Sequence, residues 1–156
     1  ESIDVISKAA GYCGMIEGQM QDMAGEGQGL DLADLKQMHE LKTGALIRAS
    51  VETGGLLAGA DEAGKQALST YAGHIGLAFQ VTDDILNVCG NPGRMGKASG
   101  TDTARAKSTY PSLMGIDAAR DYAADLISKA LQAIGIFGNK AAPLTALAAY
   151  IVERDK

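Results

Sequence analysis

Apolar side chains recur every three or four residues along most of the chain, which is the spacing of one face of an α-helix. The first such pattern covers residues 2–24 and stops at a run rich in glycine. A second begins at Asp31, a residue suited to capping a helix N-terminus, and reaches Gly54-Gly55, where we expect the helix to kink or break. A third pattern covers residues 61–88 and predicts one long helix.

A long segment without this periodicity follows, over residues 94–111, and consists of small, hydroxyl-bearing and basic residues. Loops of such length within a compact domain are usually functional or mobile. Helical spacing then resumes and predicts helices over residues 116–134 and 142–153. We find no strand pattern, so we expect an all-α fold in which residues 1–156 form a single segment with no separate second domain.

Composition supports closely packed helices and narrows the range of partners. The 156 residues are 46% hydrophobic and contain no tryptophan, which suits one domain with a sizeable helical core. A net charge of −5 argues against nucleic acid as the main partner. Residues 94–107 nevertheless contain one acid against four bases, namely Arg94, Lys97, Arg105 and Lys107. This local excess of positive charge predicts an anion site.

Cysteine content and hydropathy indicate the compartment. The two cysteines, Cys13 and Cys89, are too few for a disulfide framework, and we expect reduced, partly buried thiols. No apolar run reaches the roughly 18 residues of a membrane span, and no secretory signal is visible. We therefore expect a cytoplasmic protein. The chain begins at Glu1 rather than methionine, which is compatible with a piece of a longer protein.

The third predicted helix carries polar side chains on an otherwise apolar surface. Gln80, Asp83, Asp84 and Asn87 stand at i, i+3, i+4 and i+7, so they share one face. Two adjacent carboxylates on a buried helix repel each other and lose their hydration, and they remain charged only beside a cation. This face therefore requires a positive partner.

Mg²⁺ is the cation that fits this face and the basic segment after it. The ion takes oxygen ligands, commonly one or two carboxylates together with water and substrate phosphates. Asp83 and Asp84 would supply the carboxylates, and Lys97 and Lys107 would neutralise the remaining phosphate charge. The combination predicts a magnesium-bound diphosphate ester at the end of an apolar helical cavity.

Two further groups are candidates that remain ambiguous by themselves. Gln19 and Asp22 share a face of the first predicted helix, and Lys42-Thr43 lies in the middle of the second. Either group, taken alone, is typical of a solvated helix surface. Three glycines inside the first helix predict the close approach of another backbone or a ligand: Gly11, Gly14 and Gly18.

The stretch from Gly76 to Asn87, GLAFQVTDDILN, resembles the second aspartate-rich motif of the trans-isoprenyl diphosphate synthases, closest to the farnesyl and geranylgeranyl types. The resemblance covers essentially the whole chain. Its other matches, in chain order, are Gly18-Gln19 with Asp22, Lys42-Thr43-Gly44, Gly96-Lys97, Gly100-Thr101-Asp102 and Lys107-Ser108-Thr109-Tyr110-Pro111.

The resemblance implies a helical bundle of the isoprenoid synthase type, homodimeric, and a prenyl transfer reaction. An allylic diphosphate ionises with the help of Mg²⁺ (Mn²⁺ is also possible), and isopentenyl diphosphate attacks the carbocation and then loses a proton. In this family the residue at Asp83 binds the metal directly, and those at Asp84 and Asn87 act in the surrounding water shell. No dedicated histidine or glutamate base is expected, because the released pyrophosphate is thought to take the proton.

The resemblance also assigns the substrate-binding residues. Lys42 and Lys97 would bind the allylic diphosphate, and Lys42, the Thr43 carbonyl and Gln80 would face the developing cation. The motif matches add a further group to the substrate-binding set: Lys107, Gln19 and Asp22.

The chain departs from the family pattern in two ways. Asn87 stands where the family usually has aspartate, and nothing in the sequence corresponds to the first aspartate-rich motif. We therefore predict that these residues alone do not turn over substrate. Three other interpretations remain open: a non-catalytic or regulatory synthase subunit, a helical interaction module whose acids only form salt bridges with the basic segment, and a class I terpene cyclase.

Overall fold

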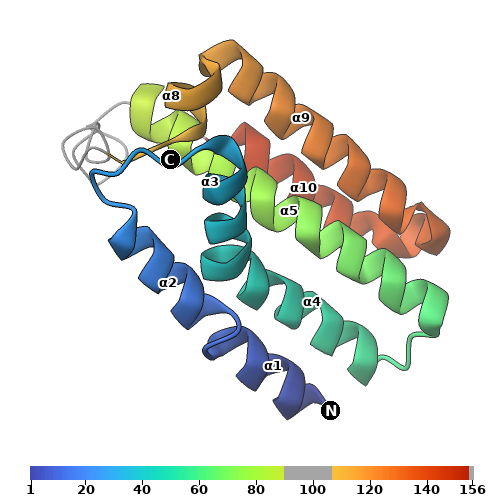
Figure 1. Ribbon diagram of the computed structural model, residues 1–156. Coiled ribbons are helices and arrows are strands. Elements are labelled where there is room, and N and C mark those ends of the chain that lie inside the picture. Colours follow the sequence, from blue (N-terminus) through green and yellow to red (C-terminus); the bar gives the residue numbers. More distant parts are fainter. Residues whose placement is uncertain (90–106, 155–156) are drawn as a thin grey trace.

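The structure is a computed structural model that describes residues 1–89 and 107–154 (Figure 1). Within these residues every regular element is helical, which confirms the expected all-α class. No helix of the described part is long and apolar enough to cross a membrane. The elements are α1 (Ser2–Ala10), α2 (Met15–Ala24), α3 (Leu32–His39), the π-helical turn η1 (Glu40–Gly44), α4 (Ala45–Leu57), α5 (Glu62–Cys89), α8 (Tyr110–Met114), α9 (Ile116–Ala133), the 3₁₀ segment η2 (Ile134–Ala141) and α10 (Ala142–Glu153).

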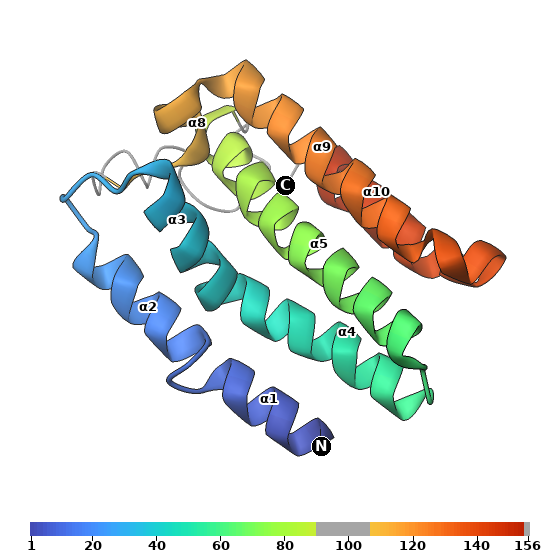
Figure 2. The same cartoon turned by 45° about the vertical axis from the view of Figure 1, so that its right-hand side comes forward.

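The long helix α5 lies in the middle of the molecule. Figures 1 and 2 show α1 and α2 following one another along one edge, with the continuous run α3–η1–α4 between them and α5. On its other side α5 packs against α9 and α10. The short helix α8 packs on α5 and α9 near the C-terminal end of α5. The start of α3 and the end of α5 lie at the same end of the molecule (Figure 2).

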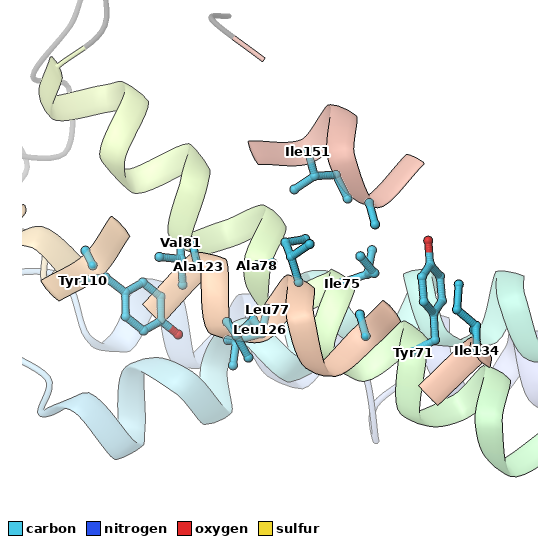
Figure 3. Packing of buried hydrophobic residues seen from close by; sticks show 14 of the residues in the cluster. Tyr71, Ile75, Leu77, Ala78, Val81, Tyr110, Ala123, Leu126, Ile134 and Ile151 are labelled. Atoms are coloured by element: carbon cyan, nitrogen blue, oxygen red, sulfur yellow. The ribbon is translucent and has the colours of Figure 1, made fainter. Parts of the chain in front are cut away.

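Apolar side chains of α5, α9 and α10 form the main core (Figure 3). Leu77 and Val81 of α5 are buried together with Leu126 of α9 and Ile151 of α10. Burying an aliphatic side chain of this size contributes about 1.5–3 kcal/mol. The hydroxyl of Tyr71 donates to the carbonyl of Leu144 at 2.8 Å, which joins α5 to α10. This core gives α5 a fixed position relative to both neighbours.

The predicted long helix is confirmed with almost the expected ends. The Asp61 side chain accepts a hydrogen bond from the Gly64 amide at 2.8 Å and so satisfies a donor of the first turn. In its middle, α5 comes close to η1: a Cβ placed on Gly76 would lie 3.1 Å from the Cα of Gly44. Two glycines facing each other allow the two helices to approach at this point.

The single helix predicted over residues 2–24 is wrong, because the chain breaks between α1 and α2. A Cβ on Gly14 would lie 2.1 Å from the carbonyl oxygen of Ala9, so the bend brings two backbone segments together where only glycine fits. The Asp31 cap is confirmed, since its side chain accepts from the Asp34 amide at 2.9 Å.

Two further expectations are also wrong. The Gly54-Gly55 pair does not break α4, which continues to Leu57, because tertiary packing against α5 supports helical geometry there. The two cysteines are exposed rather than partly buried, since Cys13 lies at the α1–α2 bend and Cys89 ends α5. The predicted helices after the basic segment are confirmed as α9 and α10.

Candidate functional site

The irregular turn η1 places two of the candidate residues, Lys42 and Thr43. Its π-helical geometry accommodates an extra residue per turn, and such insertions in helices occur frequently at functional sites. The turn lies against α2, where a Cβ on Gly18 would stand 2.2 Å from the backbone nitrogen of Lys42. Gly18 therefore permits direct backbone contact between α2 and η1, as the sequence predicted for this glycine.

Asp22 of α2 joins two lysines that are far apart in sequence. Lys42 Nζ donates to Asp22 Oδ2 at 2.7 Å, and Lys107 Nζ donates to both carboxylate oxygens at 2.9 and 2.8 Å. The Asp22 side chain is only 11% exposed. Lys107 also pairs with Glu26 at 3.3 Å. Two positive charges therefore lie at one partly buried carboxylate, and we call Asp22, Lys42 and Lys107 the lysine cluster.

Protonation of this cluster follows from its contacts. Burial alone would raise the pKa of Asp22, but hydrogen bonds and charges from Lys107 and Lys42 lower that pKa overall. Burial would lower the pKa of Lys107, but Asp22 and Glu26 raise that pKa overall. Asp22 is thus ionised and Lys107 is cationic at neutral pH.

Thr43 connects η1 with the polar face of α5. Its hydroxyl donates to the side-chain oxygen of Gln80, at a distance of 2.5 Å. Lys42 and Thr43 are neighbours in η1. The bond from Thr43 to Gln80 therefore brings the lysine cluster next to the polar face of α5. The structure thereby brings together five of the residues singled out in the sequence: Asp22, Lys42, Thr43, Gln80 and Lys107.

Asp83 has a cationic partner that the sequence analysis did not identify. Arg154, the residue after α10, donates through Nη2 to Asp83 Oδ1 at 3.1 Å and to the Phe79 carbonyl at 3.2 Å. Its guanidinium lies 4.1 Å from the centre of the Phe79 ring, a cation–π distance. The Asp83 side chain is 57% exposed, so it remains accessible to solvent beside this partner.

Asp84 occupies a different environment from its neighbour. It is buried, and its Oδ2 accepts the backbone amide of Tyr110 at 3.0 Å. Tyr110 begins α8, whose first turn is closed by a capping box between Thr109 and Ser112. Asp84 therefore holds the start of α8 against α5, and it lies deeper in the protein than Asp83.

A buried histidine lies beside the lysine cluster. His39 is 8% exposed, and its ring stands 5.6 Å from that of Tyr110. Burial first, and then the charge of Lys42, lower the pKa of His39 to about 4. Its Nδ1 has no hydrogen-bond partner among the described residues. His39 is therefore neutral at pH 7.

The donor set around α5 fits a metal that brings other ligands with it. Within residues 1–89 and 107–154, no group of three or more His, Cys, Asp or Glu side chains could hold a metal ion. Asp83 nevertheless offers an accessible carboxylate, and Asp84 and Asn87 follow on the same helix. Mg²⁺ commonly binds to one or two carboxylates while water and substrate phosphates complete its shell. These residues fit that kind of ion rather than one enclosed by protein ligands.

The remaining predicted site residues are Gln19, Asn87 and Lys97. Gln19 is exposed on α2, and Asn87 is half-buried on α5. Lys97, with most of the predicted basic segment, lies outside the described residues. Sequence reasoning missed Arg154 and Glu26, because neither stands at helical spacing from the residues that it contacts.

Comparisons with known proteins give a consistent result. The sequence model of a family described as polyprenyl synthetase matches residues 1–141. The chain is 44% identical over 160 residues to a farnesyl diphosphate synthase of Escherichia coli, covering 99% of this chain and 53% of that protein. It is 41% identical over 143 residues to a geranylgeranyl diphosphate synthase of Cyanophora paradoxa, covering 91% of this chain and 48% of that protein. The chain therefore spans about half the length of both relatives.

A solved structure extends the comparison to the fold. A geranyltransferase of Helicobacter pylori, crystallised with magnesium and isoprenyl diphosphate, superposes with a TM-score of 0.81 at 32% identity. The match covers 97% of this chain and 50% of that one. These comparisons give no support to the interpretations as a terpene cyclase or a regulatory subunit. The helical fold expected from the resemblance is confirmed.

Proposed function

The chain belongs to the polyprenyl synthetase family, and on that premise we propose that it supplies half of the active site of a short-chain trans-prenyltransferase. The reaction joins an allylic diphosphate to isopentenyl diphosphate by ionisation, condensation and loss of a proton. In this proposal residues 1–156 contribute the diphosphate-binding lysines and one of two metal-binding faces. The complementary face is the first aspartate-rich motif, to which nothing in this sequence corresponds.

The convergence of Lys42 and Lys107 is the observation that carries this proposal. They come from η1 and from the segment before α8, yet both ammonium groups lie within 2.9 Å of Asp22. Ammonium groups brought together in this way can bind the oxygens of a diphosphate. In the proposal Lys97 adds a third ammonium, and Gln19 lies at the border of the same site.

The metal half of the site is proposed around Asp83. Its exposed carboxylate would bind Mg²⁺, or Mn²⁺ in its place, and Asp84 and Asn87 would order water around the ion. A bound divalent ion withdraws charge from the departing diphosphate and so favours ionisation. Arg154 contacts one carboxylate oxygen, Oδ1, and keeps the Asp83 side chain in a defined position.

Thr43 and Gln80 are proposed to face the carbocation. The Thr43 hydroxyl donates to the Gln80 oxygen and so fixes the orientation of the amide dipole. Carbonyl dipoles that are oriented before the reaction stabilise a developing positive charge in a site from which water is excluded. The Thr43 carbonyl and the Lys42 backbone belong to the same irregular turn, so the geometry of η1 sets the position of these dipoles.

The proposal is tested by turnover with isopentenyl and dimethylallyl diphosphates and Mg²⁺ in the complete encoded protein. We expect Asp83→Asn to lower kcat/KM by about 100-fold or more. The matched control is Asp117→Asn on α9, which makes the same charge change at an exposed carboxylate whose ion pair is with Arg120. Equal activity of Asp83→Asn and Asp117→Asn would show that Asp83 takes no part in the reaction. Residues 1–156 alone should form no product, and an active fragment would refute the need for a second metal-binding face.

A further inference from the structure

Asp22 poses an electrostatic problem for a diphosphate site. A carboxylate repels the phosphate oxygens of a substrate, so a direct contact between Asp22 and that substrate is unfavourable. The Asp22 side chain is also 11% exposed and takes hydrogen bonds from two ammonium groups. Its bonding capacity is therefore directed at lysines rather than at solvent.

The geometry of the two lysines explains what a carboxylate does at this position. Lys42 and Lys107 are 65 residues apart in the chain, and their like charges repel each other. Lys107 bonds both oxygens of Asp22, whereas Lys42 bonds only Oδ2. An ammonium group carries three donors, so Lys42 can keep this bond while it donates to an incoming anion.

We propose that Asp22 is a positioning residue that holds the Lys42 and Lys107 ammonium groups side by side for diphosphate binding without contacting the substrate. The proposal rests on the function proposed above and replaces the substrate-binding role that the motif resemblance implies for Asp22. Gly18, one turn earlier on α2, lets this helix touch the backbone of Lys42 and so sets the distance from Asp22 to η1.

A double-mutant cycle in the complete encoded protein tests the role. The variants are Asp22→Asn, Lys107→Met and both together, and the probe is inorganic pyrophosphate with Mg²⁺, followed by calorimetry. We expect Asp22→Asn to weaken pyrophosphate binding about tenfold, although it removes a negative charge near an anion site. In the Lys107→Met background the same substitution should have a smaller effect, because one of the two ammonium groups that Asp22 positions is then absent.

The matched control is Glu17→Gln, which makes the same charge change on the same helix. Glu17 accepts from Gln21 at 3.0 Å and lies outside the lysine cluster. We expect it to leave pyrophosphate affinity unchanged within about twofold. Pyrophosphate binding that is unchanged or tighter in Asp22→Asn would overturn the proposal, because charge removal alone favours the anion. An effect of full size in the Lys107→Met background would also overturn it.

A second measurement needs no variant. NMR titration of ¹³C-labelled lysine side chains should give Lys107 a pKa above the ordinary value of 10.5, since Asp22 and Glu26 both favour its charged form. An ordinary or lowered Lys107 pKa would contradict the arrangement even if Asp22→Asn does not fold. Turnover of allylic substrate by the unsubstituted protein is a separate outcome. Its absence would refute the proposed function, whereas the lysine titration would still decide whether Asp22 holds Lys107.

Discussion

His39 makes the stability of this protein depend on pH in a way that can be calculated. The folded protein holds its pKa at about 4, against an ordinary value of 6.5, because the ring is buried beside Lys42. The unfolded chain therefore binds a proton between these two values that the folded chain does not bind. Stability is present in full above the unfolded pKa and is lost as the pH falls from 6.5 towards 4.

The magnitude follows from the two pKa values. Linkage between pKa 6.5 and about 4 makes the His39 contribution at pH 5 about 2 kcal/mol less favourable than at pH 7. Replacing His39 by phenylalanine keeps a ring of similar size against Tyr110 and removes a buried Nδ1 that has no partner among the described residues. The variant should therefore lose about 2 kcal/mol less stability than the unsubstituted protein over this interval.

Urea unfolding followed by far-UV circular dichroism at pH 7 and pH 5 measures both proteins under the same conditions. Carboxylates titrate in both, so the difference between the two pH-dependent losses isolates His39. His74→Phe is a second comparison, because burial lowers the pKa of His74 as well, while the charges that act on it are those of Lys129, Asp125 and Lys36 rather than that of Lys42. Equal losses in His39→Phe and the unsubstituted protein would refute the buried, neutral state assigned to His39.

Two further substitutions test contacts that support the site. Gly18→Ala should destabilise the protein by about 1–2 kcal/mol and raise the KM for allylic diphosphate, because its Cβ would stand 2.2 Å from the Lys42 nitrogen. The control Gly54→Ala, where a Cβ meets nothing within 4 Å, should instead stabilise α4 by up to about 1 kcal/mol, and equal effects would contradict the close packing of α2 on η1. Arg154→Gln should cost about 1–2 kcal/mol in urea unfolding, through loss of the cation–π contact and the Asp83 pair, and no loss would show that α10 is held without them.

Local patterns predicted most of the helices. The continuous apolar periodicity over residues 61–88 needs no distant partner to be recognised, and α5 matches it nearly end to end. The pattern failed where tertiary contacts decide the backbone. The bend at Gly14 and the π-helical turn at Glu40–Gly44 have no periodic signal, because each depends on what the chain packs against.

The candidate site shows the same division. The order of the motifs was sufficient to predict the family to which the chain belongs. The magnesium diphosphate site, predicted from the spacing of Gln80, Asp83 and Asp84 on one helix face, stays a prediction. Spacing along one helix carries no information about partners from other helices. It therefore could not show that Asp83 faces Arg154 while Asp84 holds Tyr110.

By itself, then, the amino-acid sequence determined the helical class, the extent of α5 and the identity of the acidic and basic candidates. Only the tertiary structure decided how those charges are paired. It places Asp22 between Lys42 and Lys107, two lysines that a sequence interpretation would leave on separate segments. The physical reason is that helix periodicity is a local property, whereas the pairing of buried charges depends on which helices fold against one another.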